Sequence, residues 1–321
     1  DRSPSRGLGD VYKRQDLRII SGEKTAGVRP GVTLGHEIAG RIASLGEGVE
    51  GLVVGQQATI SIVVSCGTCR ACLAGREHLC SHCELVGYGL DGGLAPWLCV
   101  PAQAVSRGNI IPVATEIPAT RLALAEPLSC VLNGHRRHGG VNPGETVVII
   151  GGGAIGLLHT ALNLACGAGR VILCEKHADR RDRAAAMGAV TTCPEHLSEV
   201  VTEHTGGYGA ELVIVAIGRN ELTEESLNLA APGGRVSWFA GFPKGSTTTI
   251  TPNTVHYQEL TISGGSNASR ADVHRAVDML GRGNIDETPI VTHTFGLSQW
   301  TEAVDAVRGH VGVKIAIDPR R

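Results

Sequence analysis

Residues 146–156 read TVVIIGGGAIG, in which an apolar run meets a glycine-rich turn, and this stretch decides the fold. The run Thr146–Ile150 has the length and β-branched content of a buried strand. In a strand–turn–helix unit with G-x-G-x-x-G spacing, the first glycine makes the turn, the second admits a pyrophosphate and the third lets the helix meet the strand. The stretch therefore predicts a dinucleotide site, with candidate residues Gly151, Gly153, Ile155 and Gly156.

The carboxylate that should complete such a site is Glu175, which follows the apolar run VILC. A carboxylate about 20 residues beyond the glycines accepts hydrogen bonds from the adenosine ribose. It would also repel a 2'-phosphate, so the sequence favours NAD over NADP. Two alternatives remain. Glu175 could be a solvated charge at a strand end, and Lys176, Arg180 and Arg181 could bind a 2'-phosphate.

Apolar segments on either side of this stretch follow two patterns. From about residue 126 to 265, strands alternate with helices, which predicts a parallel, doubly wound α/β sheet. From residue 16 to about 112, short apolar strands are separated by glycines, which predicts a β-rich, barrel-like domain. From about residue 267 we expect a helix, a strand, a second helix and a final strand.

Composition describes an ordinary globular protein of 321 residues, with 42% hydrophobic and 19% charged residues. A net charge of −2 gives no electrostatic reason to expect nucleic acid or an anionic membrane as a partner. No run approaches the roughly 18 apolar residues that span a bilayer, and no apolar signal region is visible. We expect a cytoplasmic protein, and its unpaired cysteines fit a reducing compartment.

Four cysteines lie close together in the spacing C-x2-C-x2-C-x7-C, namely Cys66, Cys69, Cys72 and Cys80. Four thiolates at this spacing can surround one tetrahedral Zn2+ at about 2.3 Å each, so the sequence predicts a structural zinc site. A disulfide pair is one alternative. An iron–sulfur cluster is another, although the compact ferredoxin spacing differs. His82 and Cys83 lie close enough to replace Cys80 as a ligand.

A second candidate metal site combines His36 and Glu37, in LGHEIAG, with Glu126, in AEPLSC. An imidazole and carboxylates are common zinc ligands. Glu126 lies among apolar residues, where an unpaired charge is costly and a metal would offset that cost. The alternative for His36 is a buried, hydrogen-bonded side chain without a metal.

Several motifs occur together in the order seen in zinc-dependent medium-chain dehydrogenases/reductases: GHEIAG (35–40), the four cysteines, GGLAPWLCVPA (92–102), AEPLSC, GGGAIG and GVKIAIDP (312–319). The resemblance covers residues 16–319 and is strongest to the sorbitol (L-iditol) dehydrogenase branch and related polyol or threonine dehydrogenases. One reason is that Glu126 stands where alcohol dehydrogenases have a cysteine ligand. The resemblance implies a GroES-like (chaperonin-10-like) catalytic domain, residues 16–128 with 267–321, and a Rossmann NAD-binding domain, residues 129–266.

One part of the family pattern is missing. The family has Cys-Gly-Thr/Ser-Asp upstream of Gly-His-Glu, with the cysteine as a zinc ligand and the hydroxyl residue starting a proton relay. Asp16 continues this pattern here, but Lys13, Arg14 and Gln15 precede it. Residues 1–15 show no helical or strand period, and RGLGDVYKRQ resembles a leader seen at the ends of unrelated translated sequences. We interpret residues 1–15 as a foreign leader over a truncated N-terminus. A disordered native tail is the alternative.

For the intact enzyme the resemblance implies one structural and one catalytic zinc, the latter held by His36, Glu126 and, directly or through water, Glu37. Zinc lowers the pKa of a bound secondary alcohol of the polyol type, and a hydride passes to nicotinamide C4 of NAD. Arg18 stands where some members carry a relay histidine. A homodimer or homotetramer is expected. The alternatives are a zinc-free enone or quinone reductase, and an inactive chain that binds NAD and zinc.

Overall fold

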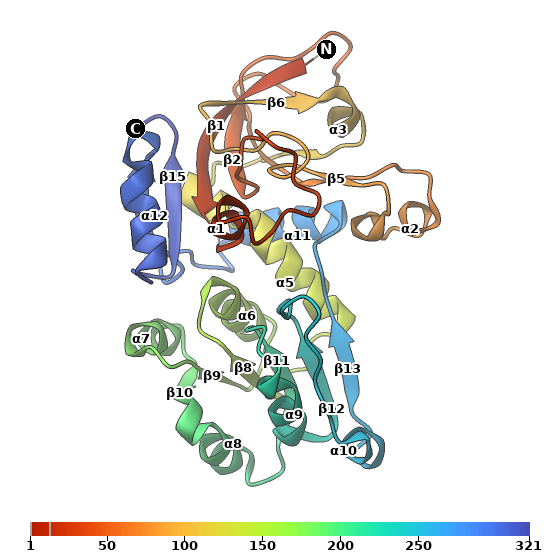
Figure 1. Ribbon diagram of the computed structural model, residues 1–321, viewed down its shortest axis with the longest axis vertical. Helices are drawn as coiled ribbons and strands as arrows, with labels where there is room; N and C mark the ends of the chain where they lie inside the picture. The colour runs from red at the N-terminus through yellow and green to blue at the C-terminus, as the bar shows by residue number, and fades with distance from the viewer. Residues whose placement is uncertain (1, 13) are drawn as a thin grey trace. The chain divides into compact units, whose positions relative to one another are not determined.

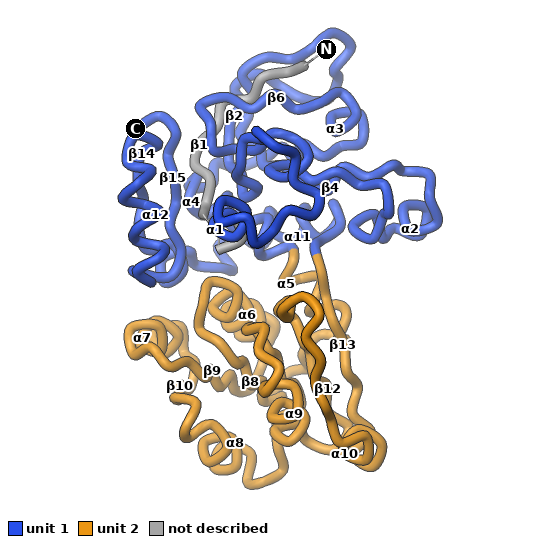
Figure 2. Tube along the Cα trace, in the orientation of Figure 1, with its two compact units in different colours: residues 1–129, 267–321 blue, residues 130–266 orange. Residues whose placement is uncertain are grey.

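The computed structural model describes residues 2–12 and 14–321 (Figure 1). Side chains are described from Asp16 onward. The chain divides into two compact units (Figure 2). Unit 1 contains residues 1–129 and 267–321, and unit 2 contains residues 130–266. No helix within the described ranges combines the length and the apolar character that crossing a membrane requires.

Unit 2 is built on a parallel sheet with the strand order β10-β9-β8-β11-β12-β13. Numbered along the chain, this order is the 3-2-1-4-5-6 arrangement of a doubly wound dinucleotide-binding sheet. The predicted α/β fold class is therefore confirmed. The strands are β8 (Thr146–Ile150), β9 (Arg170–Cys174), β10 (Val190–Thr192), β11 (Ala210–Val215), β12 (Ala230–Trp238) and β13 (Thr261–Gly264).

The central strands of this sheet are apolar along their whole length. Val147, Val148 and Ile149 of β8 are fully buried, as are the last four residues of β11. Strands read as continuous apolar runs when helices cover both faces of a parallel sheet. The helices of unit 2 are α6 (Ala154–Ala165), α7 (Ala178–Ala186), η2 (Pro194–His196), α8 (Leu197–Thr205), α9 (Glu221–Asn228) and α10 (Pro252–Tyr257).

Unit 1 contains a mainly antiparallel sheet in the order β14-β15-β1-β2-β3-β7, in which β6 also pairs with β1. The last strand of the chain, β15, lies between β14 and β1, so residues 267–321 complete the sheet that the first part of the chain begins. The strands are β1 (Arg2–Tyr12), β2 (Ile38–Ile42), β3 (Gln57–Ile60), β6 (Trp97–Pro101), β7 (Ile110–Pro112), β14 (Val291–Gly296) and β15 (Lys314–Asp318).

The other elements of unit 1 are short, apart from three helices. A two-stranded sheet of β4 and β5 stands beside the cysteine segment. Helix α5 begins in unit 1 and continues into unit 2. The elements are α1 (Arg14–Ile20), β4 (Val63–Val64), α2 (Arg70–Leu73), η1 (Glu77–Leu79), β5 (Glu84–Leu85), α3 (Ala102–Ser106), α4 (Ala119–Leu122), α5 (Ala125–Arg137), α11 (Arg270–Gly281), η3 (Leu297–Gln299) and α12 (Trp300–Arg308).

The backbone of the first residues differs from the expectation. The sequence predicts no regular element in residues 1–15, whereas Arg2–Tyr12 forms β1, which pairs with β2, β6 and β15. A disordered tail is therefore not what the structure contains there. The foreign origin of this segment stays a prediction. Position 13, where the family pattern has its cysteine, lies outside the described residues.

Candidate metal centres and dinucleotide site

His36 and Glu37 lie just before β2, on a segment fixed by close backbone packing. Gly35 has φ 96°, and its carbonyl oxygen accepts from Gly93 N at 2.9 Å. A Cβ added at Gly92 would lie 2.1 Å from the same oxygen. The motifs GHEIAG and GGLAPW are therefore neighbours because only glycine allows this approach.

The three predicted ligands of the second metal site come together. His36, Glu37 and Glu126 each offer one ligand atom within 4.8 Å of the others, and all three side chains are buried. Glu126 reaches the group from the first turn of α5. Within the described residues, neither ring nitrogen of His36 has a hydrogen-bond partner. Because buried polar atoms are normally hydrogen-bonded, this histidine has the character of a metal ligand.

Two further buried charges surround the group. Asp16 Oδ1 lies 3.6 Å from His36 Nδ1, and Lys314 Nζ lies 2.5 Å from Glu37 Oε2. Both Asp16 and Lys314 are almost fully buried. Three carboxyl groups and one lysine are thus gathered around the imidazole of His36. Because imidazole nitrogens and carboxylate oxygens are zinc ligands, the residues present fit a zinc ion.

The sequence predicts His36, Glu37 and Glu126 for this site but does not identify Lys314 or Asp16 as their neighbours. The only signal for Lys314 is a lysine inside the apolar strand KIAI. Arg18, at the expected relay position, does not join the cluster. Its side chain is half exposed and pairs with Glu23 at 3.5 Å.

One wall of the cluster is aromatic. The Tyr88 ring is buried, with its centroid 5.2 Å from that of His36. Lys24 Nζ lies 4.3 Å from the centroid of the same ring. Tyr88 therefore covers the imidazole and limits the access of water to it.

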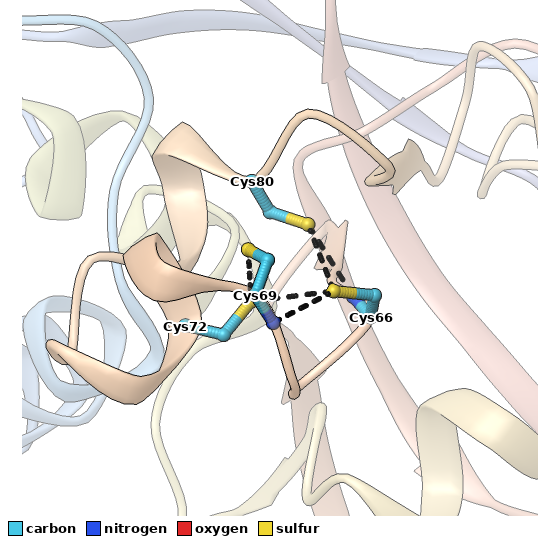
Figure 3. A group of neighbouring side chains, drawn as sticks. All are labelled: Cys66, Cys69, Cys72 and Cys80. Carbon is cyan, nitrogen blue, oxygen red and sulfur yellow. Dashed lines mark hydrogen bonds between the residues drawn. The ribbon is translucent and has the colours of Figure 1, made fainter.

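The four cysteines of the other predicted site converge, and Figure 3 shows their side chains pointing toward one another. The sulfur separations are 3.9 Å for Cys66 and Cys72, 3.5 Å for Cys69 and Cys72, and 3.5 Å for Cys66 and Cys80. A tetrahedron of sulfurs at about 2.3 Å from zinc has edges of about 3.8 Å. The cysteine lobe, which we define as residues 66–83, therefore has the shape of a tetrahedral zinc site.

The alternatives for this lobe are less consistent with the geometry. All ten cysteines of the chain lie in the described part, and none of them is in a disulfide bond. The separations are far longer than the disulfide bond length of about 2.05 Å. The convergent group contains neither His82 nor Cys83. His82 contributes only its backbone N–H, which lies 3.4 Å from Cys80 Sγ.

The cysteines of the lobe differ in how strongly their surroundings favour the thiolate form. Hydrogen bonds from the Thr68 and Cys69 backbone and from the Thr68 hydroxyl lower the pKa of Cys66 to about 5. Although the Cys66 N–H bonds to the sulfur of Cys80, burial and the thiols of Cys66 and Cys72 raise the pKa of Cys80 to about 11. A cation bound among the sulfurs would offset the effect that raises the pKa of Cys80, because a coordinated thiol loses its proton.

The glycines of the dinucleotide turn occupy three different environments. Gly151 has φ 113°, and a Cβ at Gly156 would lie 1.7 Å from the Gly151 carbonyl oxygen, so helix α6 packs directly on the turn. At Gly153, the residue before α6, a Cβ would meet nothing within 4 Å. The half-buried Ile155 follows in the first turn. The N-terminus of α6 is therefore open to an anion, as the glycine pattern predicts.

Glu175 lies at the end of β9 against this turn. Its Oε2 accepts from Gly152 N at 2.8 Å, and its Oε1 accepts from His177 N at 3.0 Å. The side chain is buried, and a carboxylate retains further lone pairs for a ribose hydroxyl. Arg181 donates to the carbonyl oxygens of Glu175 and Lys176, and Arg180 is half buried. The guanidinium of Arg181, one of the predicted ligands of a 2'-phosphate, is thus already hydrogen-bonded to backbone oxygens.

Two family models match the chain. The alcohol dehydrogenase GroES-like domain matches residues 12–112, and the zinc-binding dehydrogenase model matches residues 154–282. The L-threonine 3-dehydrogenase of Pyrococcus horikoshii is 32% identical over 286 residues, covering 88% of this chain and 80% of the relative. The sorbitol dehydrogenase of Halalkalibacterium halodurans is 29% identical, covering 90% of this chain and 83% of the relative.

A solved structure from Sinorhizobium meliloti, described as a zinc-binding dehydrogenase and bound to NADP, has the same fold. Its TM-score is 0.90 at 30% sequence identity, and the alignment covers 99% of this chain and 92% of that chain. The similarity therefore extends over both units and over the elements that carry the two candidate metal groups.

Proposed function

Because the chain belongs to the zinc-dependent medium-chain dehydrogenase/reductase family, we propose that the intact enzyme, with the family's cysteine in place of Lys13, is an oxidoreductase that transfers a hydride between a secondary alcohol and NAD. The observation that carries this proposal is the buried group of His36, Glu37 and Glu126. Its ring nitrogens and carboxylates match the ligand types of catalytic zinc sites.

A zinc ion in this group would supply a Lewis acid that lowers the pKa of an alcohol hydroxyl. His36 and Glu126 would hold the ion, and Asp16 would orient the imidazole through Nδ1. Glu37 would act directly or through a water molecule, because Lys314 already shares its carboxylate. Tyr88 would keep water from the imidazole. The cysteine lobe would hold a second, structural zinc.

The secondary-alcohol class rests on what the relatives' names share. The 3-hydroxyl of L-threonine is a secondary alcohol, and so are the interior hydroxyls of sorbitol. Polyols are therefore the first substrates to examine, with L-threonine as the comparison. The zinc-free reductase alternative has no need of a buried ligand group or of a four-cysteine lobe.

NAD is the cofactor that we propose, although the S. meliloti relative was solved with NADP. The reason is the buried Glu175 carboxylate beside the glycine turn, which would face a 2'-phosphate with its own negative charge. A homodimer or homotetramer in the cytoplasm remains part of the proposal, to be tested by sedimentation and by cell fractionation.

The test combines metal analysis with an activity screen. The purified chain should bind two zinc ions per molecule, and the His36→Ala variant should bind one while keeping its secondary structure. NAD reduction would then be followed with polyols, L-threonine and other secondary alcohols, before and after zinc loading. Two zinc ions that persist in His36→Ala would contradict the proposed catalytic site.

A further inference from the structure

Glu77 connects the cysteine lobe to a distant helix of the same unit. Its side chain is buried, although it belongs to the short helix η1. Glu77 Oε1 accepts from the Arg270 backbone N–H at 2.9 Å and lies 3.4 Å from Arg270 Nε. A buried carboxylate needs such partners, because its desolvation is otherwise uncompensated.

Arg270 is the first residue of α11, so the carboxylate lies at a helix N-terminus. Ser269 forms a capping box with Asp272, but the Arg270 N–H has no partner inside the helix and receives one from Glu77. A negative charge there also interacts favourably with the helix dipole. The first turn of α11 is therefore held by its own cap and by the cysteine lobe.

This helix begins where the chain passes from unit 2 into unit 1. Unit 2 ends at residue 266, and Asn267 has φ 54°, in the left-handed region that few residues other than glycine adopt. Only residues 267–269 therefore separate the start of α11 from the boundary between the two units.

Within the lobe, the position of Glu77 depends on a cysteine of the convergent group. Its carbonyl oxygen accepts from Cys80 N at 3.0 Å, and Cys80 Sγ lies 3.5 Å from Cys66 Sγ. A metal that gathers the four sulfurs would fix Cys80 and, one turn earlier, Glu77. Without the metal, the four sulfurs have no shared bonding partner, and this turn is less constrained.

We propose that metal binding in the cysteine lobe is coupled, through Glu77, to the ordering of the first turn of α11. The lobe then anchors the crossing at residues 267–270 in addition to stabilising itself. This inference rests on zinc binding by the lobe, as proposed above, but not on dehydrogenase activity. Because coupling is reciprocal, the state of the α11 cap must also change the retention of the lobe zinc.

The test is a double-mutant cycle read by amide hydrogen exchange in residues 267–274. Four proteins are compared after the same exposure to zinc: the parent, Cys69→Ser, which should lack the lobe zinc, Glu77→Gln and the double variant. In the parent background, Cys69→Ser should speed exchange at the start of α11 by about fivefold or more. In the Glu77→Gln background the same substitution should change it little. Equal effects in both backgrounds would overturn the coupling.

Glu287→Gln provides a matched control. Glu287 is a mostly buried carboxylate of unit 1 that pairs with Arg121 at 2.6 Å, and neither residue belongs to the lobe. The effect of Glu287→Gln on exchange should add to that of Cys69→Ser. The change that Cys69→Ser causes at the start of α11 should stay the same. A general loss of stability would make both pairs of variants behave alike.

The reverse direction is read by zinc release to a chromogenic chelator. Ser269→Ala, which removes the capping side chain of α11, should speed release from the lobe only when Glu77 is present. A parent lobe that holds no zinc would overturn this inference and the proposed structural zinc, but not the proposed hydride transfer. If the lobe holds zinc but Ser269→Ala speeds its release equally with and without Glu77, only this inference is overturned.

Discussion

Lys314 Nζ lies 2.5 Å from Glu37 Oε2, and both side chains are almost completely buried. The lysine starts the last strand, β15, whereas the glutamate precedes β2. The pair therefore joins two segments that are far apart in the sequence at the candidate catalytic metal group. A lysine in this place competes with a metal for Glu37 and compensates its charge when the metal is absent.

Lys314→Met should destabilise the metal-free protein by about 3–5 kcal/mol, because it leaves a buried carboxylate without its partner. Zinc should then stabilise the variant more than the parent, since Glu37 becomes available as a direct ligand. Denaturant unfolding with and without zinc measures both effects. Lys244→Met, at an exposed position, should stay within about 0.5 kcal/mol of the parent. An equal zinc response in parent and variant would contradict this role.

The ligand set of the cysteine lobe can be tested one cysteine at a time. Each single Cys→Ser substitution at position 66, 69, 72 or 80 should lower the zinc content by one ion per chain, because each removes one of four convergent sulfurs. Cys83→Ser should leave the content unchanged. Metal analysis after gel filtration gives the count. Loss of zinc from Cys83→Ser, with retention in Cys80→Ser, would require the alternative ligand set.

The cofactor preference depends on Glu175. Glu175→Gln should weaken NAD binding about tenfold, since a charge-assisted hydrogen bond is worth about 1.4 kcal/mol more than a neutral one. The same substitution should weaken NADP binding less, because it also removes the repulsion between the carboxylate and the 2'-phosphate. Fluorescence titration of both cofactors measures the ratio, with the exposed Glu195→Gln as control. Tighter binding of NADP than NAD by the parent would show that nearby cations dominate this pocket.

The parts of the molecule that the sequence predicts are those encoded by local patterns. The strand alternation of residues 146–264 and the spacing of Cys66 to Cys80 each involve neighbours in the chain, so the parallel sheet and the convergence of the sulfurs can be expected. The glycines of GHEIAG and GGLAPW also have local signals, but their mutual contact requires the folded structure.

The contacts that the sequence does not predict join distant residues. Lys314 and Glu37, or Arg270 and Glu77, meet because tertiary packing places them together, and 193 positions separate the second pair. No periodicity indicates which buried carboxylate receives which cation. The strand β1 is a similar case, since its residues lack an apolar alternation and the strand is defined by its pairing with β2, β6 and β15.

Unit 2 should lose stability in mild acid because of three neighbouring histidines. Burial, followed by the charges of His135 and Arg235, lowers the pKa of His138 to about 4, and burial lowers the pKa of His159 well below its usual value. The unfolded chain would bind these protons near pH 6.5. The contribution of these neutral histidines to the free energy of unfolding is therefore fully present above about pH 6.5. It declines as the pH falls toward 4, by up to about 1.4 kcal/mol per pH unit for each histidine.

His138→Gln should reduce this slope between pH 6.5 and 4.5, as measured by urea unfolding at several pH values. The exposed His196→Gln, which removes a surface contact with Glu199, should leave the slope unchanged. A variant and a parent with the same pH dependence would mean that His138 does not bind its proton on unfolding.

The last prediction concerns catalysis by this chain. The family pattern has a cysteine ligand where Lys13 stands, so of the expected ligands His36, Glu37 and Glu126 remain for the catalytic zinc. We expect little or no NAD-linked oxidation of polyols or other secondary alcohols by the unaltered chain, although unit 2 should bind NAD. The combined variant Lys13→Cys, Arg14→Gly and Gln15→Thr adds a thiolate and a relay hydroxyl. Its affinity for zinc should rise by more than the 10–100-fold that an outer-shell partner contributes.

The measurement is a zinc titration of both proteins, followed by cofactor reduction with a panel of polyols. Lys244→Cys adds a thiol at an exposed site and should change neither quantity. Visible absorption of the cobalt-substituted variant should contain a thiolate-to-metal band beyond that of the cysteine lobe. Robust zinc-dependent turnover by the unaltered chain would refute the need for a ligand at position 13. The three-residue group would then be a sufficient catalytic site.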